Sequence, residues 1–247
     1  MAAGPVSRVA HAYGNSRDRI ELAVGAGVEL IEADLRYRHG AIDVRHDYRL
    51  PVLPLLYNRG LRGIHKRWPW AISFGSTMVR LDIGRISLAE LLRLVSGRGG
   101  LMLDLKRDTF EPGEARCFGE AVLRQIDATG FDGRIAYCGY WPLLDAVAQL
   151  RPDAQCWYSL DTTLDCEHLL DRLSGATRIE RVTVQRDLLT PERAAALRAA
   201  RIEFYAWDIE DALQAERAID LGATGIIADD LAMMAGLRHP ARHATES

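Results

Sequence analysis

Short apolar runs alternate along this chain with amphipathic stretches of roughly ten to fifteen residues, and this alternation constrains the fold more than any other feature. The short runs are typical of buried strands, and the longer stretches are typical of helices that cover them. The alternation predicts eight strands, namely Ser7–His11, Leu30–Tyr37, Leu101–Leu105, Arg134–Cys138, Cys156–Leu160, Arg181–Val184, Ile202–Trp207 and Gly225–Ala228. It predicts helices between them, among them Arg17–Ala26, Glu114–Ala128, Pro142–Leu150, Leu164–Leu173 and Ala212–Leu221.

Strands that alternate with helices through right-handed connections form a parallel sheet. Eight such strands in a chain of 247 residues favour closure into a (β/α)8 TIM barrel, which commonly needs about 250 residues. A doubly wound open sheet is the alternative, but no expected strand is followed by the G-x-G-x-x-G pattern of a dinucleotide site. We therefore expect an α/β protein with a single TIM-barrel domain over residues 1–247.

Two segments interrupt the alternation after the second expected strand. Ile42–His46 follows a His39-Gly40 turn and predicts a small hairpin arm. Residues 48–85 are too long for a simple connection and predict an insertion at the rim that carries the active site in TIM barrels. The insertion is rich in basic and aromatic residues, namely Arg59, Arg62, His65, Lys66, Arg67, Trp68 and Trp70. It could form a lid or a basic collar for substrate, or a solvated loop pinned by its aromatic side chains. The polar tail 238–247 is expected to fray.

Composition limits the classes of protein that fit. The net charge of −3 argues against nucleic acid as a partner, because nucleic-acid-binding domains are usually strongly basic. No window offers the 18 apolar residues of a membrane span, and residues 1–8 contain no apolar signal segment, so no stable membrane anchor is expected. The four cysteines form no C-x-x-C pair and predict reduced thiols in a cytoplasmic protein. The sequence leaves the oligomeric state open.

Three carboxylates are expected to meet where neighbouring strands end. Glu32 and Asp34 are two residues apart on a strand, so their side chains share one face, and Asp104 ends the next barrel strand. Such acids repel one another unless a cation lies between them, so that neutralising Asp34 could even stabilise a metal-free protein. Three carboxylates suit a single hard divalent ion, Mg²⁺ or Ca²⁺. A structural network of acids with Lys106 is the alternative.

Two histidines stand at neighbouring strand ends. His11 closes the first expected strand and His46 closes the hairpin arm. Histidine titrates near neutral pH, so this pair could act as general acid and general base at a phosphodiester, with Lys106 and the ion neutralising phosphoryl oxygens. Without a thiolate in the cluster, tetrahedral zinc is disfavoured. Later strands add further polar ends, namely Trp207, Asp208, Asp229 and Asp230.

These residues lie in segments that resemble the glycerophosphodiester phosphodiesterase family. The similar segments follow in order over nearly the whole chain, namely Val9-Ala10-His11, Gly27–Asp34, Val44–Asp47, Leu103–Lys106, Tyr205–Asp208 and Gly222–Asp229. The resemblance implies a TIM barrel in which His11 and His46 are catalytic. It implies that Glu32, Asp34 and Asp104 hold the metal and that Lys106 contacts the phosphate. Trp207 is a further candidate for substrate contact.

The chain also departs from the family pattern. The usual His-Arg-Gly is His11-Ala12-Tyr13 here, and the following Glu-Asn-Thr is Gly14-Asn15-Ser16. Arg36, Arg45 or the basic insertion could replace the missing phosphate-binding arginine. Asp104 stands where glutamate is more common, as in the related sphingomyelinase D group.

Three functions remain open. The first is hydrolysis of a glycerophosphodiester or related lipid-headgroup phosphodiester, with a small molecule or a lysolipid as substrate. The second is a sphingomyelinase D-like or phospholipase D-like reaction, in which a neighbouring substrate hydroxyl attacks and gives a cyclic phosphate. The third is a non-catalytic barrel that binds a phosphorylated ligand.

Overall fold

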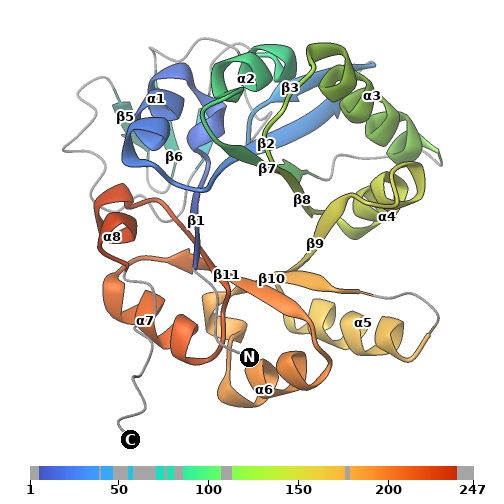
Figure 1. Ribbon diagram of the computed structural model, residues 1–247, viewed down its shortest axis with the longest axis vertical. Helices are drawn as coiled ribbons and strands as arrows, with labels where there is room; N and C mark the ends of the chain where they lie inside the picture. Colours follow the sequence, from blue (N-terminus) through green and yellow to red (C-terminus); the bar gives the residue numbers. More distant parts are fainter. Residues whose placement is uncertain are drawn as a thin grey trace, which may run out of the picture.

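The computed structural model describes residues 6–38, 40–46, 55–57, 71–74, 77–80, 86–106, 113–175 and 179–237. Eight parallel strands close into a barrel, because β1 pairs with β2 on one side and with β12 on the other (Figure 1). The barrel strands are β1 (Ser7–Ala10), β2 (Leu30–Arg38), β7 (Gly100–Leu105), β8 (Ile135–Gly139), β9 (Gln155–Leu160), β10 (Arg181–Gln185), β11 (Glu203–Ile209) and β12 (Gly225–Ala228). The predicted TIM barrel is confirmed.

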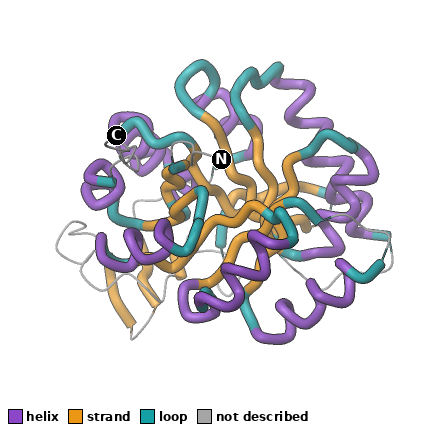
Figure 2. The backbone as a smooth tube through the Cα atoms, turned by 60° about the horizontal axis from the view of Figure 1, so that its bottom comes forward, coloured by secondary structure: helices purple, strands orange, loops and turns teal. Residues whose placement is uncertain are grey.

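Helices surround the strands on the outside, as the tube in Figure 2 shows. They are α1 (Arg17–Ala26), α2 (Leu88–Val95), α3 (Glu114–Thr129), α4 (Trp141–Leu150), α5 (Thr163–Leu173), α6 (Pro191–Ala199), α7 (Ala212–Asp220) and α8 (Leu231–Gly236). The helix starts are encoded locally: the hydroxyls of Ser87 and Thr190 accept the backbone N–H groups of Glu90 and Arg193. Helix α8 was not predicted from the sequence, although Asp230 caps it in the same way.

The segment after β2 differs from the expected long loop. The hairpin arm is confirmed as β3 (Ala41–Val44), which pairs antiparallel with β2. The insertion contains a small antiparallel sheet in which β6 (Thr77–Arg80) pairs with both β4 (Leu55–Tyr57) and β5 (Ala71–Phe74). The expected basic and aromatic residues of the insertion, from Arg59 to Trp70, lie outside the described residues, as does Asp47.

The alternation of side chains along each strand builds two separate apolar cores. Ile31, Ala33 and Leu35 of β2 point outward and pack under the helices. Leu30 of the same strand points inward, where it joins a cluster that includes Trp157 and other inward residues. Glu32 and Asp34 continue this inward row toward the carboxyl end of β2. The barrel therefore has an apolar floor and a polar upper layer.

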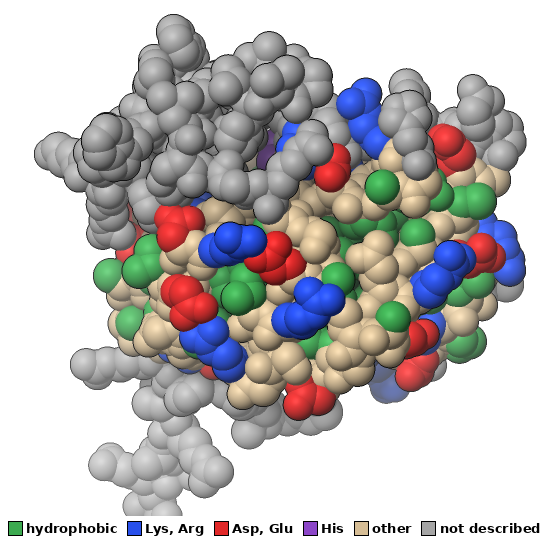
Figure 3. Space-filling model, turned by 90° about the horizontal axis from the view of Figure 1, so that it is seen from above, with side chains coloured by type: hydrophobic (Ala, Val, Ile, Leu, Met, Phe, Trp, Pro, Cys, Tyr) green, Lys and Arg blue, Asp and Glu red, His purple; other side chains and the backbone are tan. Residues whose placement is uncertain are grey.

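The outer surface mixes charges of both signs. Figure 3 shows one face on which described basic and acidic side chains are interspersed with hydrophobic ones rather than gathered by sign. Surface ion pairs contribute to this mixing, such as Arg98 with Glu21 at 2.6 Å. None of the described helices is long and apolar enough to cross a membrane. All four cysteines are free.

Candidate active site

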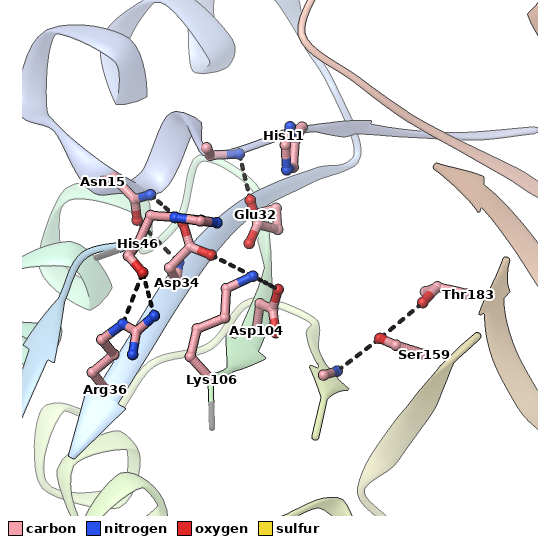
Figure 4. A network of polar contacts seen from close by, with 12 residues as sticks. His11, Asn15, Glu32, Asp34, Arg36, His46, Asp104, Lys106, Ser159 and Thr183 are labelled. Atoms are coloured by element: carbon pink, nitrogen blue, oxygen red, sulfur yellow. Dashed lines mark hydrogen bonds and ion pairs between the residues drawn. The ribbon is translucent and has the colours of Figure 1, made fainter. Parts of the chain in front are cut away.

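The three predicted carboxylates meet at the carboxyl ends of β2 and β7 (Figure 4). The register of the two strands places Asp34 directly beside Asp104, and Glu32 lies on the same inward face one step below. One oxygen from each of the three carboxylates lies within 4.8 Å of the others. Glu32 and Asp34 are fully buried, which makes this an expensive concentration of negative charge.

The turn after β1 holds two of these acids. Ala12 adopts a left-handed backbone conformation with φ 56°, and its N–H donates a hydrogen bond to the Glu32 carboxylate. Asn15 binds Asp34 twice: its side-chain amide donates to the carboxylate, and its carbonyl oxygen accepts the Asp34 N–H at 3.0 Å. This role of Asn15 was not predicted, although its place in the turn after the first strand is a signal in the sequence that could have indicated it.

Lys106 forms ion pairs with two acids of the cluster. Its ammonium group lies 2.9 Å from Asp34 Oδ1 and also pairs with Asp104. Burial alone would raise the pKa of Asp34, but Lys106 and the Asn15 hydrogen bond hold that pKa below its usual range. For Glu32, burial and then the Asp34 charge raise the pKa to about 8. The Asp34 charge thus repels that of Glu32, while Lys106 stabilises Asp34 itself, so a gain in stability on neutralising Asp34 stays a prediction.

His11 lies beside a carboxylate from the other end of the chain. Its Nδ1 atom is 3.3 Å from Asp229 Oδ1, and its backbone N–H donates to the Ala228 carbonyl at 3.0 Å. Burial lowers the pKa of His11, but Asp229, and then Glu32 and Asp34, outweigh burial and raise it to about 9. The ring is therefore an imidazolium at neutral pH.

His46 approaches the cluster from the end of the hairpin. The hairpin is tied to β2 where the Arg45 N–H donates to the Asp34 carbonyl at 2.8 Å. The Arg36 guanidinium donates to the His46 carbonyl oxygen, with Nε at 2.8 Å. Burial lowers the pKa of His46 and outweighs the nearby acids, so this ring is held neutral. The two histidines thus carry opposite protonation states at neutral pH.

A cavity of about 530 Å³ opens above these groups. Its wall includes most of the predicted site residues, namely His11, Glu32, His46, Asp104, Lys106 and Trp207. Asp34 lies behind them and is inaccessible. Among the described wall residues, Arg36 and Arg45 are not found, and Arg36 is turned toward the His46 backbone instead. The structure therefore does not bring these two arginines to the cavity.

The opposite wall is formed by polar groups at the ends of β9, β10 and β11. The Thr183 hydroxyl lies 3.1 Å from the Ser159 hydroxyl, which also accepts the Gly139 N–H at 3.1 Å (Figure 4). A β-bulge in β11 breaks the alternation there, so that the consecutive residues Trp207 and Asp208 both line the cavity. This wall could contact the alcohol part of a substrate.

The acidic cluster fits a hard divalent cation. Within the described part of the chain, no group donates a hydrogen bond to the buried Glu32 Oε1 or Asp104 Oδ1, so each offers an oxygen that a cation would satisfy. Burial is the main cause of the raised pKa of Glu32, and an excess of negative charge beside it, which Lys106 does not fully offset, raises that pKa further. A metal ion held by oxygen ligands would remove this excess.

The fold and the site together define the class of protein, a (β/α)8 barrel in which an acidic cluster that fits a cation lies between two histidines. No family model matches the chain. The glycerophosphodiester phosphodiesterase GDPD4 of Arabidopsis thaliana is 25% identical over 251 residues, which cover 94% of this chain and 71% of that protein. This comparison supports the family resemblance that the sequence motifs indicate.

Solved structures share the fold. A Silicibacter pomeroyi structure, provisionally named a glycerophosphoryl diester phosphodiesterase, matches with a TM-score of 0.68 at 20% identity, over 91% of this chain and 90% of that one. A phosphodiesterase of Oleispira antarctica in complex with the product sn-glycerol-3-phosphate matches with a TM-score of 0.65 at 15% identity, over 91% and 93% of the two chains. At 15–20% identity these matches show a shared fold, and the Arabidopsis relative supports the resemblance to the glycerophosphodiester phosphodiesterase family.

Proposed function

We propose that this protein is a metal-dependent phosphodiesterase that hydrolyses a glycerophosphodiester or a related lipid-headgroup phosphodiester. The observation that carries the proposal is the meeting of two histidines, three carboxylates and one lysine around a single cavity. The names of the relatives support the reaction class, and the product bound to the Oleispira antarctica enzyme supports a small phosphodiester as substrate.

Glu32, Asp34 and Asp104 would hold the ion, and an all-oxygen donor set favours Mg²⁺ or Ca²⁺. When bound, the ion would act as a Lewis acid that neutralises negative charge on the phosphoryl group. Lys106 is poised to bind a phosphoryl oxygen, because its ammonium group lies in the cavity wall beside the acids. Trp207 on the far wall would contact the alcohol part of the substrate.

The two histidines would divide the proton transfers. His11, held as an imidazolium, would donate a proton to the leaving alcohol oxygen, because its positive charge is stabilised by Asp229. His46, held neutral by burial, would accept a proton from the attacking oxygen. Arg36 would keep His46 in place through the His46 carbonyl.

The attacking oxygen could come from water or from a neighbouring hydroxyl of the substrate. The cyclising reaction of the sphingomyelinase D group is a second candidate, because the chain has Asp104 in place of glutamate and Ala12 in place of arginine. Phosphorus NMR of the product separates the two, because a cyclic phosphate and an open monoester have distinct resonances.

The test is an assay of the full chain against a panel of glycerophosphodiesters and lysophospholipids, with Mg²⁺, Ca²⁺ or chelator. We expect metal-dependent turnover that Asp34→Asn abolishes. Asp132→Asn is the matched control, because Asp132 is an acid that binds Ser96 on the outside of the barrel. Binding of a phosphorylated ligand without turnover in any metal would instead indicate a non-catalytic barrel.

We also propose that the chain forms one catalytic domain and that it works in the cytoplasm. Four free cysteines support this location, because thiols stay reduced there. Burial raises the pKa of the Cys138 thiol well above its ordinary value, which makes it an inert residue despite its place in the cavity wall.

A further inference from the structure

Asp229 follows β12 and is fixed by residues from the opposite end of the chain. The buried Arg19 of α1 extends its guanidinium to 3.6 Å from Asp229 Oδ1. The Tyr13 hydroxyl donates to the Asp229 carbonyl at 2.9 Å, and the Arg19 guanidinium stacks over the Tyr13 ring at 4.1 Å. A hydrogen bond therefore holds the backbone of Asp229, whereas its carboxylate is held by ion pairs with Arg19 and His11.

Arg19 also binds the backbone of the histidine itself. Its guanidinium donates to the His11 carbonyl at 3.3 Å, so one side chain holds both His11 and Asp229. Since Nδ1 of His11 faces the carboxylate, Nε2 is the ring nitrogen left for the cavity that His11 lines. A buried arginine is a costly way to hold two residues unless their relative position matters.

We propose that Asp229, held by Arg19, is a positioning residue that fixes His11 with Nδ1–H on the carboxylate and Nε2 toward the cavity. The catalytic consequence rests on the proposed function. As the bond between phosphorus and the leaving oxygen breaks, its electron pair goes to that oxygen, which takes the Nε2 proton of His11. The alcohol leaves neutral, and His11 becomes a neutral imidazole with its proton on Nδ1, still bonded to Asp229. A proton from the attacking oxygen passes to His46.

Charged groups from four elements face His11, and their balance predicts how the pKa of His11 changes when one of them is removed. They are Asp229 after β12, Arg19 of α1, Glu32 and Asp34 of β2, and His46 after β3. Burial lowers the pKa of His11, and Asp229 contributes the largest opposing effect. Removing the Asp229 charge should therefore lower the pKa of His11, so that the ring loses its proton at a lower pH.

The first test is an NMR titration of the His11 ring in the full chain, with and without Mg²⁺. The His11 signals are assigned by their absence in His11→Gln. In Asp229→Asn we expect the pKa of His11 to fall by about 1–3 units, the range for loss of an opposite charge at close range. Asp230→Asn is the matched control, because Asp230 is the next residue and caps α8 instead of facing His11. It should leave the pKa of His11 unchanged.

The second test compares leaving groups. A proton donor matters for a poor leaving group such as a glycerol or alkyl alkoxide and matters little for an aryl oxide. Asp229→Asn should therefore lower kcat about 10–100-fold on a glycerophosphodiester, within the range of general acid catalysis, and less than about threefold on an aryl phosphodiester. A general loss of structure would lower both rates equally.

The outcomes separate this inference from the proposed function. An unchanged pKa of His11 in folded Asp229→Asn, or equal losses on both substrates, would overturn the role of Asp229 even if the wild type is an active phosphodiesterase. A fallen pKa without hydrolysis of any phosphodiester would support the positioning role and reject the function. If Asp229→Asn fails to fold, the test is the NMR titration of the wild type. A pKa of His11 below that of His46 would then overturn the inference.

Discussion

Gly139 offers the sharpest test of how tightly the carboxylate cluster is built. It ends β8 with φ +109°, a backbone conformation that L-residues rarely adopt. A Cβ atom there would lie 2.6 Å from the Leu105 carbonyl oxygen and closer still to Asp104 Oδ1. A side chain at position 139 would therefore occupy space that the Asp104 carboxylate fills.

The structure gives the size of the effect of Gly139→Ala. The left-handed backbone costs about 1–2 kcal/mol for an L-residue. Crowding against Asp104 and Leu105 costs a further 1–3 kcal/mol or so, the usual range for overpacking. We therefore expect the free energy of unfolding to fall by about 2–5 kcal/mol, and Tm by about 4–20 °C for a chain of this size.

Gly130→Ala is the matched control for the backbone effect alone. Gly130 ends α3 with φ +62°, and an added Cβ there would meet no atom within 4 Å. This variant should lose only about 1–2 kcal/mol. Urea unfolding of both variants gives the two free energies, and the rise of Tm with added Mg²⁺ or Ca²⁺ reports metal binding.

Gly139→Ala should also weaken the metal-induced rise of Tm, because Asp104 Oδ1 must move, whereas Gly130→Ala should retain it. The reasoning is refuted if the two variants unfold with free energies within about 0.5 kcal/mol of each other and bind the ion equally. That result would mean that the cluster tolerates a displacement of Asp104.

Three further predictions concern the charges and rings of the site. In the metal-free protein, the pKa of Glu32 in the folded state is about 8, above its ordinary value of 4.5. The protonated carboxyl therefore contributes fully to the free energy of unfolding below pH 4.5, and this contribution is lost as the pH rises through 8. Glu32→Gln should therefore unfold at a higher temperature than the wild type at pH 8, and scanning calorimetry should show this advantage disappear near pH 4.5. His11→Ala and His46→Ala should each lower kcat about 10²–10⁴-fold, with the double variant losing far less than the product of the two; multiplicative losses in steady-state kinetics would contradict a joint role. Arg36→Met should lower kcat more than it raises KM, because the side chain holds His46 and does not line the cavity; a change in KM alone would point to substrate contact.

Local sequence patterns are sufficient to predict the barrel and the inward row of acids. Strand and helix periods are local properties, so runs such as Arg17–Ala26 and Gly225–Ala228 appear in the structure with the predicted bounds. The two-residue period of a strand likewise places Glu32 and Asp34 on one face before any tertiary contact is known.

The surroundings of these acids, in contrast, depend on contacts between distant parts of the chain. Asp229 meets His11 because the last strand closes against the first, a contact between residues 218 positions apart that no local pattern records. Arg36 turns to the His46 backbone because the hairpin folds back on β2, although its charge suggested a phosphate contact. Side-chain direction and charge balance depend on which elements become neighbours. That is why the acids could be listed from the sequence, whereas the pKa values of the two histidines depended on the closed barrel.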